Sequence, residues 1–525
     1  MGYPVPIPVD TPLPFDGFRT YAGLHMRHQD LMAATPWVHQ ETVGQTHYGR
    51  AIYAYRLGDD DLLTVEGLPE PAMLTNGGIH AREWQSPETV TGIMELLALH
   101  EEDHHLYDYL RDNVNMIVIP SLNIDGFMQT QKFPTENYLG VDPSYPESSP
   151  RDGRMRRKNM LDVDEHLYTL GDLMRGVDLN RNNDPFWNTN PERSSSNVLS
   201  LVYHGIAPAS EPETQALDAA AQLGPSDRLR IYTDVHSFSQ VHFWGRNRNT
   251  RLTAQTEEVL GTFSNHHNAF DASKWYAYAD RNSVAQNSGI GTTEEYFLHT
   301  YQVPSWTLEI EPSGGQDFHS PLPGGGADYG GTGENGHDGF ILPESEITRV
   351  REELAQTFAA VYYRQAGPPA INTLRMLDSE TDAVVFEAQW DTVNNQTRSL
   401  YSKQLRPLKL DHSYHVWMSF NKPMRWRVDG EVVPFPGQPA NTLDLEADLL
   451  VGESSLTTIL EAGDWLNQPG EAPDGFMNYR DDALKLTFRF ASDELNLGLV
   501  NGVTDVTMML ETSDMTGMAT DANPA

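Results

Sequence analysis

The sequence predicts an α/β region, with a mixed, mostly parallel sheet flanked by helices on both faces, followed by an all-β sandwich. Up to residue 365, short apolar runs alternate with segments of helical periodicity, a pattern typical of layered α/β sheets. A Gly-Pro-Pro linker follows at residues 367–369. Beyond the linker, apolar residues recur with a period of two, as in antiparallel strands. We therefore expect two domains, residues 1–368 and 369–525.

The elements of the first domain follow from local signals. Ser86 is expected to cap one helix, and Ser210 and Glu213 have the spacing of a capping box at the start of another. The longest helix is expected over residues 344–365. Buried strands are expected where the apolar runs are short and rich in branched residues: 51–55, 71–75, 115–123, 229–235 and 305–310.

The second domain has alternating polar and apolar residues over 414–420 and 483–490, which predicts strands with one buried face. An Asp-Gly pair at 429–430 lies between two such runs and predicts a hairpin. This part loosely resembles bacterial immunoglobulin-like domains, and we expect a bacterial source and a spacing or stabilising role.

Composition excludes several classes of partner and site. The chain has 36 basic and 74 acidic residues, a net charge of −38, so we expect no nucleic-acid partner. It has no cysteine, which excludes disulfides and thiolate metal sites. No apolar run reaches the ~18–20 residues of a membrane span. The first ten residues lack the features of a signal peptide, and we expect them to be a trimmed mature N-terminus.

Polar residues cluster where predicted strands end. His80 and Glu83 follow one strand, His236 and Ser237 follow another, and Glu309 lies at the end of a third. Ligands of α/β sheets bind at the carboxyl ends of the strands. Two histidines and a carboxylate would leave a coordination position open, as in a catalytic zinc site. Such residues also end ordinary strands, so the pattern alone leaves both readings open.

Eight short motifs occur in order along the first domain: GIHAREW, NIDGF, RMRRKN, GVDLNRN, YHG with SEPET, DVHSFSQ, TLEIE and HDGFILP. With these motifs the chain resembles, over roughly residues 20–365, the zinc metallocarboxypeptidases of the carboxypeptidase A/B type.

The resemblance implies one zinc ion in the first domain, bound by His80, Glu83 and His236. It implies that Glu309 is the general base acting on a zinc-bound water. It implies that Arg157 polarises the scissile carbonyl and stabilises the oxyanion.

Further residues match the family's substrate contacts. Asn180 and Arg181 match the pair that grips the terminal carboxylate, for which a guanidinium offers a two-pronged donor. Asp178 matches the carboxylate that orients the first zinc histidine. Arg82 and Ser237 match auxiliary substrate contacts.

The position of the family's mobile tyrosine departs from the pattern. The best-matching residue is Ala285, and Tyr276, Tyr278 and Tyr301 are the nearby residues that could substitute for it. This departure concerns substrate binding more than the chemical step.

The residue at the floor of the specificity pocket is predicted from the spacing along the sequence between Tyr296 and Glu309, which matches the spacing in the family. This match aligns the floor with Glu294. An acid there resembles the B type, which takes Lys or Arg at the C-terminus. An unpaired buried carboxylate is costly, so a substrate cation gains selective binding. The alternative alignment places Thr292 or Thr293 at the floor and Glu294 on the rim.

The implied partners are peptides or proteins with a free C-terminal carboxylate, and the oligomeric state is left undetermined. We expect secretion or a periplasmic location. A calcium site in the glycine-rich segment is a further hypothesis, resting on Asp317, Asp328, Glu334 and Asp338. Two alternatives remain. One is a peptidase that cuts cell-wall peptides beside diaminopimelate, and the other is a catalytically silent binding or adhesion protein.

Overall fold

The computed structural model describes two parts of the chain. The contacts divide it after Ala366, except that Arg248–Gln255 group with the later part. Up to Ala366 the described residues are 17–65, 69–99, 104–132, 156–163, 174–224, 229–245, 250–270, 276–278, 290–312, 340, 342 and 344–366. In the second part they are 371–393, 397–406, 409, 411–420, 424, 426–428, 431–433, 449–451, 454–456, 458–466, 472, 483–490 and 506–508.

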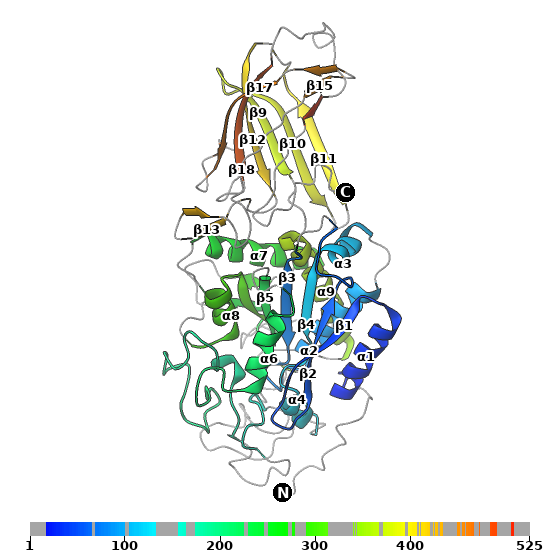
Figure 1. Ribbon diagram of the computed structural model, residues 1–525, viewed down its shortest axis with the longest axis vertical. Coiled ribbons are helices and arrows are strands. Elements are labelled where there is room, and N and C mark those ends of the chain that lie inside the picture. Colours follow the sequence, from blue (N-terminus) through cyan, green and yellow to red (C-terminus); the bar gives the residue numbers. More distant parts are fainter. Residues whose placement is uncertain are drawn as a thin grey trace. The chain divides into compact units, whose positions relative to one another are not determined.

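The first unit is built on an eight-stranded sheet with the order β1-β2-β4-β3-β5-β8-β6-β7 (Figure 1). The central neighbours β4, β3, β5 and β8 run parallel, whereas β1, β2 and β6 join the sheet by antiparallel pairing. The predicted mixed sheet is therefore confirmed. Its strands are β1 (Val38–Gln45), β2 (Ala51–Leu57), β3 (Ala72–Gly77), β4 (Asn115–Ile119), β5 (Leu229–Ser237), β6 (Val241–Trp244), β7 (Ala277–Tyr278) and β8 (Ser305–Ile310).

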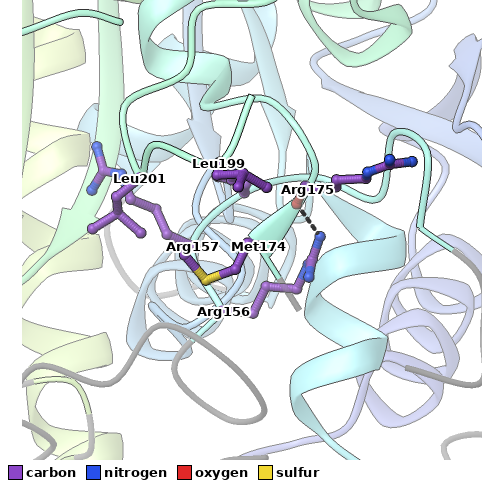
Figure 2. Close-up of a pocket in the computed structure, with 7 residues that line it drawn as sticks. Arg156, Arg157, Met174, Arg175, Leu199 and Leu201 are labelled. Atoms are coloured by element: carbon purple, nitrogen blue, oxygen red, sulfur yellow. Dashed lines mark hydrogen bonds between the residues drawn. The ribbon is translucent and has the colours of Figure 1, made fainter. Parts of the chain in front are cut away.

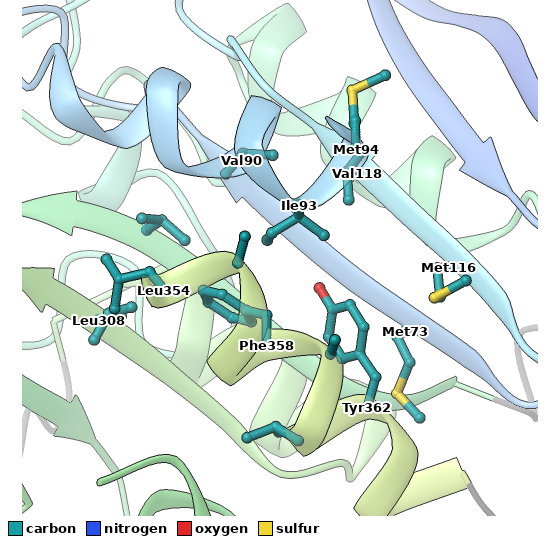
Figure 3. Close-up of a cluster of buried hydrophobic side chains, with 14 of the residues drawn as sticks. Met73, Val90, Ile93, Met94, Met116, Val118, Leu308, Leu354, Phe358 and Tyr362 are labelled. Atoms are coloured by element: carbon teal, nitrogen blue, oxygen red, sulfur yellow. The ribbon is translucent and has the colours of Figure 1, made fainter. Parts of the chain in front are cut away.

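Helices cover both faces of this sheet. Helices α2 and α9 pack together on one face, where Ile93 and Phe358 lie in one apolar cluster with Met73 of β3 (Figure 3). Leu217 of α6 packs on the opposite face with Leu74 of β3. The helices are α1 (Tyr21–Ala34), α2 (Gln85–Leu99), α3 (Tyr109–Asn113), α4 (Ile124–Thr130), α6 (Pro212–Ala221), α7 (Thr250–Asn268), α8 (Thr293–Tyr296) and α9 (Glu344–Ala366), with shorter turns η1 (His104–Asp108), η3 (Leu179–Arg181) and η6 (Phe297–Tyr301).

Two helix starts differ from the sequence prediction. Helix α2 begins at Gln85, and the Ser86 hydroxyl accepts a hydrogen bond from Gly78 N–H at 2.5 Å instead of capping the helix. Helix α6 has Glu211 at its N-cap without a side-chain cap, and Ser210 donates to the Glu211 carboxylate. The capping-box prediction was wrong because tertiary partners took the side chains that would have capped locally.

Asp234 and His236 of strand β5 lie on one face of the sheet. Ile231 and Val235 point to the α2 and α9 side, while Tyr232 packs in the cluster that contains α6. Because side chains alternate along a strand, Asp234 and His236 share the face of Tyr232. The carboxyl ends of β3, β5 and β8 thus bring polar residues together on one face of the sheet.

The second unit contains a six-stranded antiparallel sheet in the order β11-β10-β9-β12-β18-β17. The expected alternation holds, since Tyr414 and Val416 of β12 and Leu484 and Leu486 of β18 are buried in its core. The predicted hairpin is present as β13 and β14. The face-to-face packing that defines a sandwich stays a prediction. The strands are β9 (Ile371–Asp378), β10 (Val384–Val393), β11 (Thr397–Gln404), β12 (Ser413–Phe420), β13 (Trp426–Val428), β14 (Glu431–Val433), β15 (Leu449–Val451), β16 (Ser454–Leu456), β17 (Thr458–Trp465), β18 (Ala483–Phe490) and β19 (Val506–Met508).

None of the helices in the described residues combines the length and the apolar character needed to cross a lipid bilayer.

Candidate metal centre and active site

The loop after β3 carries His80 and Glu83 and is held firmly at its start. Gly78 adopts a φ of +67°, a conformation that side chains with a Cβ rarely take, and its N–H is bonded to Ser86 of α2. This turn joins the end of the strand to the first turn of the helix. Both His80 and Glu83 are 2% exposed in consequence.

Three ligand atoms converge at a buried point. Glu83 places Oε1 at 2.8 Å from Nδ1 of His80 and Oε2 at 2.9 Å from Nδ1 of His236. Both ring nitrogens of His236 lie within ion-pair distance of a carboxylate, Nδ1 at 2.9 Å from Glu83 and Nε2 at 2.8 Å from Asp234. The residues fit zinc, which takes histidine nitrogen and carboxylate oxygen in catalytic sites.

The charges around this point favour a cation. Burial opposes ionisation of Glu83, but the two histidines beside it hold its pKa below the ordinary value. Burial also opposes protonation of His236, yet Asp234 and Glu83 raise its pKa well above the ordinary value. The same carboxylates would stabilise a divalent ion at this point.

Each histidine is backed by a second carboxylate on its far nitrogen. Nε2 of His80 lies 3.0 Å from Oδ1 of Asp178, and Nε2 of His236 lies 2.8 Å from Oδ2 of Asp234. A carboxylate on Nε2 fixes the tautomer that leaves Nδ1 free to ligate. The sequence analysis identified Asp178 but missed Asp234. The signal was present, because Asp234 lies two residues before His236 in a strand.

Glu309 lies next to the metal site on the neighbouring strand. It pairs in register with His236 across β5 and β8, and it is the one residue of β8 that is not fully buried. Its Oε2 atom is nevertheless shielded and has no hydrogen-bond partner among the described residues. Burial raises the pKa of Glu309 to about 8 in the metal-free site, with Glu83 adding to the increase and His236 opposing it.

Arg157 enters the site from a loop that is fixed by its neighbours. Its Nε donates to Oδ2 of Asp178 at 3.1 Å, and its Nη1 lies 3.9 Å from Oε1 of Glu83. Arg156 donates to the carbonyl oxygens of Asn159 and Arg175, the latter bond being drawn in Figure 2. The small pocket in that view is lined by Arg156, Arg157, Lys158, Met174, Arg175, Leu199 and Leu201.

Asn180 and Arg181 lie in η3, directly after Asp178. Oδ1 of Asn180 accepts the N–H of Thr293 at 2.9 Å. The Arg181 guanidinium donates to two carbonyl oxygens, those of Arg193 and of Asn180 itself. A substrate carboxylate would therefore compete with these main-chain acceptors. Burial lowers the pKa of Arg181, and Asp178 opposes this decrease.

Helix α8 carries the residues whose alignment the sequence left open. Oε2 of Glu295 accepts the N–H groups of Ile290, Gly291 and Thr292, which fixes the helix start. Glu294 is buried, and its Oε2 accepts a hydrogen bond from the Thr307 hydroxyl of β8 at 3.1 Å. Thr307 precedes Glu309 by two residues and shares its face of the strand.

Arg82 and Ser237 lie at the edge of the metal site. The Arg82 guanidinium lies 4.3 Å from the ring centroid of Phe340, and burial, with Arg157 nearby, lowers its pKa to about 10. The Ser237 N–H donates to Oε2 of Glu83 at 3.3 Å. Ser237 therefore helps to orient the Glu83 carboxylate.

Two of the three tyrosines proposed as substitutes for the mobile tyrosine have other partners. Tyr276 is buried and its hydroxyl accepts the N–H of Glu311. The Tyr301 hydroxyl donates to Asp218 at 2.8 Å. The side chain of Tyr278 and the whole of Ala285 lie outside the described residues. So do the four residues of the calcium hypothesis, which gains no support.

Three other groups of His and carboxylates occur in the described residues, and each already has a donor in place. Asn159 donates to both carboxylates of the group formed by His47, Glu211 and Glu213. Arg349 pairs with both carboxylates of the group formed by His267, Glu311 and Glu353. Lys409 pairs with Asp378 in the group formed by Asp378, Glu380 and His412. A metal would have to displace a donor in each of these groups.

Comparison with known proteins shows the family of the chain. A sequence profile of the zinc carboxypeptidases matches residues 27–357. A carboxypeptidase B from Astacus astacus is 28% identical over 323 residues, which cover 60% of this chain and 85% of that protein. A carboxypeptidase B from Bos taurus is 27% identical over 331 residues, covering 62% of this chain and 64% of that protein.

Two solved structures share the fold. Thrombin-activatable fibrinolysis inhibitor matches with a TM-score of 0.50 and 19% identity, over 69% of this chain and 77% of that chain. Carboxypeptidase A from Helicoverpa armigera matches with a TM-score of 0.50 and 23% identity, over 68% and 75%. The profile match spans more than half of the sequence. The chain belongs to the zinc carboxypeptidase family and is a zinc-dependent metallocarboxypeptidase.

Proposed function

We propose that the chain removes the C-terminal residue of peptides or proteins at a single zinc ion held by His80, Glu83 and His236. The observation that carries this proposal is the convergence of three buried ligand atoms beside Glu309. Bound zinc supplies Lewis-acid chemistry at the scissile carbonyl.

Glu309 is the general base in this proposal. Its shielded Oε2 takes the proton from the attacking water and passes it to the leaving amine. Because burial raises the pKa of Glu309, its carboxylate is a stronger base than an exposed glutamate. Arg157 is the cation beside the developing oxyanion, and its contact with Asp178 holds it in place before substrate arrives.

Asn180 and Arg181 are proposed to bind the substrate's terminal carboxylate. The Asn180 amide is oriented by Thr293, which takes Oδ1 and leaves Nδ2 as the donor for a ligand. Arg82 and Ser237 are proposed as contacts further along the peptide. The acceptors that Arg181 now uses are main-chain carbonyls, so a charged carboxylate would be the stronger partner.

Glu294 is proposed as the floor of the specificity pocket, with a preference for C-terminal Lys or Arg. Its contact with Thr307 supports the alignment in which Glu294 itself, rather than Thr292 or Thr293, faces the substrate. The named relatives called carboxypeptidase B are consistent with this preference. A cell-wall peptide ending in diaminopimelate would offer a similar amine and is the second candidate substrate.

A peptide panel tests these proposals together. Peptides ending in each of the twenty residues, as free acids and as amides, are incubated with zinc-loaded enzyme and with chelator-treated enzyme. We expect cleavage of free acids only, loss of activity with chelator, and recovery with zinc. Equal cleavage of acids and amides would indicate an endopeptidase or amidase, and no cleavage by the zinc-loaded enzyme would favour the silent binding protein. Secretion and a bacterial source remain proposals.

A further inference from the structure

We infer that Asp234 and Thr293 are positioning residues that tie the metal ligand His236 to the substrate-carboxylate clamp at Asn180. The inference rests on the proposed function for the roles of His236 and Asn180. The link itself rests on contacts between buried side chains of β5, α8 and η3.

Asp234 is held from both sides. Its Oδ1 accepts a hydrogen bond from Nδ2 of Asn76 at 2.7 Å, and Oδ1 of Asn76 in turn accepts one from the Tyr232 hydroxyl at 2.6 Å. Its Oδ2 accepts the Thr293 hydroxyl at 2.8 Å and lies 2.8 Å from Nε2 of His236. Oδ2 of Asp234 therefore contacts both the proposed metal ligand His236 and Thr293 of helix α8.

Thr293 extends the link to the clamp. Its N–H donates to Oδ1 of Asn180 at 2.9 Å, while its hydroxyl donates to Asp234. The main chain and the side chain of one residue thus orient two groups with different roles. Thr293 itself is 1% exposed, so water does not replace these bonds readily.

The other zinc histidine is connected to the same asparagine. Oδ1 of Asp178 lies 3.0 Å from Nε2 of His80 and accepts the N–H of Asn180 at 3.1 Å. The contacts close a ring that runs from His80 through Asp178, Asn180, Thr293 and Asp234 to His236, with Glu83 joining the two histidines. Each histidine is backed by one oxygen that also bonds the clamp side of the site.

The consequence is mutual positioning. If Asp234 loses its charge, His236 loses the charged partner on Nε2. If Thr293 loses its hydroxyl, Oδ2 of Asp234 loses the bond that fixes it beside His236. Changes to such partners of metal-bound histidines typically cost about 10–100-fold in metal affinity or activity. If Thr293 shifts, the Asn180 amide also loses its orientation, and binding of the terminal carboxylate weakens.

The chain offers a matched control for the threonine substitution. Thr233 is also fully buried, and it precedes Asp234 in β5, but it shares the face of Ile231 and Val235. Its hydroxyl has no hydrogen-bond partner among the described residues. Thr233→Val therefore makes the same chemical change as Thr293→Val, but at the residue next to Asp234 and outside the ring of contacts.

The experiment compares wild type with Asp234→Asn, Thr293→Val, Thr293→Ser, Thr233→Val and the double variant of Asp234→Asn with Thr293→Val. Two readouts are used: the rate of zinc release to a chromogenic chelator, and KM and kcat for a free-acid peptide. We expect Asp234→Asn and Thr293→Val to speed zinc release about 10–100-fold. We expect Thr293→Val also to raise KM, and Thr293→Ser and Thr233→Val to stay near wild type.

The double variant tests the link directly. Because both substitutions act through Oδ2 of Asp234, the effect of the double variant on zinc release should be smaller than the product of the two single effects. Zinc release in Thr293→Val equal to that in Thr233→Val would overturn the inference. Effects that multiply in the double variant would also overturn it. If Asp234→Asn fails to fold, the comparison of Thr293→Val with Thr293→Ser still decides. If wild type cleaves no free-acid peptide, the proposed function fails, while zinc release still tests the link.

Discussion

At Glu309, burial and charge act against each other. Desolvation favours the protonated form, and so does the nearby Glu83 carboxylate, whereas His236 and Arg157 favour the ionised form. Bound zinc would add a further positive charge and lower the pKa from its metal-free value. The pKa of Glu309 in the zinc-loaded enzyme therefore depends on the balance between burial and the positive charges around the carboxylate.

Replacing Glu309 by Gln should remove turnover and leave zinc binding intact. The amide cannot accept the proton, so we expect kcat to fall about 10²–10⁴-fold. Zinc content by atomic absorption and kcat for a free-acid peptide measure the two effects. Full activity in this variant would refute the assignment of the base.

Replacing Glu294 by Gln should remove the preference for basic C-terminal residues. A charge-assisted contact contributes about 1.5–3 kcal/mol, so the ratio of kcat/KM for Arg-ended over Leu-ended peptides should fall at least about tenfold. Gln keeps the side-chain volume and serves as its own steric control. If the wild type cleaves Leu-ended or Phe-ended peptides faster than Arg-ended ones, Glu294 is not the pocket floor.

Between elements, buried carboxylates join helix α6 to the turn after β1. Nε2 of His47 lies 2.9 Å from Oε2 of Glu211, and Nδ2 of Asn159 donates to both Glu211 and Glu213. Burial raises the pKa of Glu213 to about 7. The hydrogen bond with Glu211 raises the pKa of His47. Both groups therefore hold protons more tightly in the folded state than in the unfolded chain.

This cluster should make stability fall as pH rises. Glu213 goes from an ordinary pKa of 4.5 to about 7 on folding, so the folded state binds more protons between these values and loses stability as pH increases through them. The raised pKa of His47 acts in the same direction. We expect the Tm of zinc-saturated wild type to drop more between pH 5 and pH 8 than that of Glu213→Gln. Glu352→Gln, at an exposed position of α9, is the control and should follow wild type.

For the whole molecule, charge bears on which substrates arrive fastest. A net charge of −38 gives the molecule a negative field that attracts cations and is screened by salt. If the site prefers basic termini, kcat/KM for an Arg-ended peptide should fall several-fold as salt rises, while that for a neutral Leu-ended peptide changes little. Stopped-flow assays at low and high NaCl measure this. Equal salt dependence would mean that the charge serves solubility only.

The sequence by itself determined the strand–helix alternation, the candidate metal ligands His80, Glu83 and His236, and the family. Buried parallel strands are rich in apolar residues, so 71–75, 229–235 and 305–310 were predicted as strands, and the structure has them as β3, β5 and β8. The polar residues that end them were visible because they interrupt those runs. Amphipathic edge strands such as β1 carry no such run, and β1 was missed.

Tertiary structure alone decided which side chain meets which. The caps expected at Ser86 and Ser210 did not form because other groups bond those hydroxyls: Gly78 N–H donates to Ser86, and the Asn182 amide, 28 positions away, donates to Ser210. The contact between Glu294 and Thr307 likewise depends on how α8 lies against β8. The position of Asp234 two residues before His236 is visible in the sequence, but its hydrogen bond with Thr293 joins residues 59 positions apart. A linear sequence fixes the periodicity of local structure, whereas contacts at such separations exist only once the chain has folded.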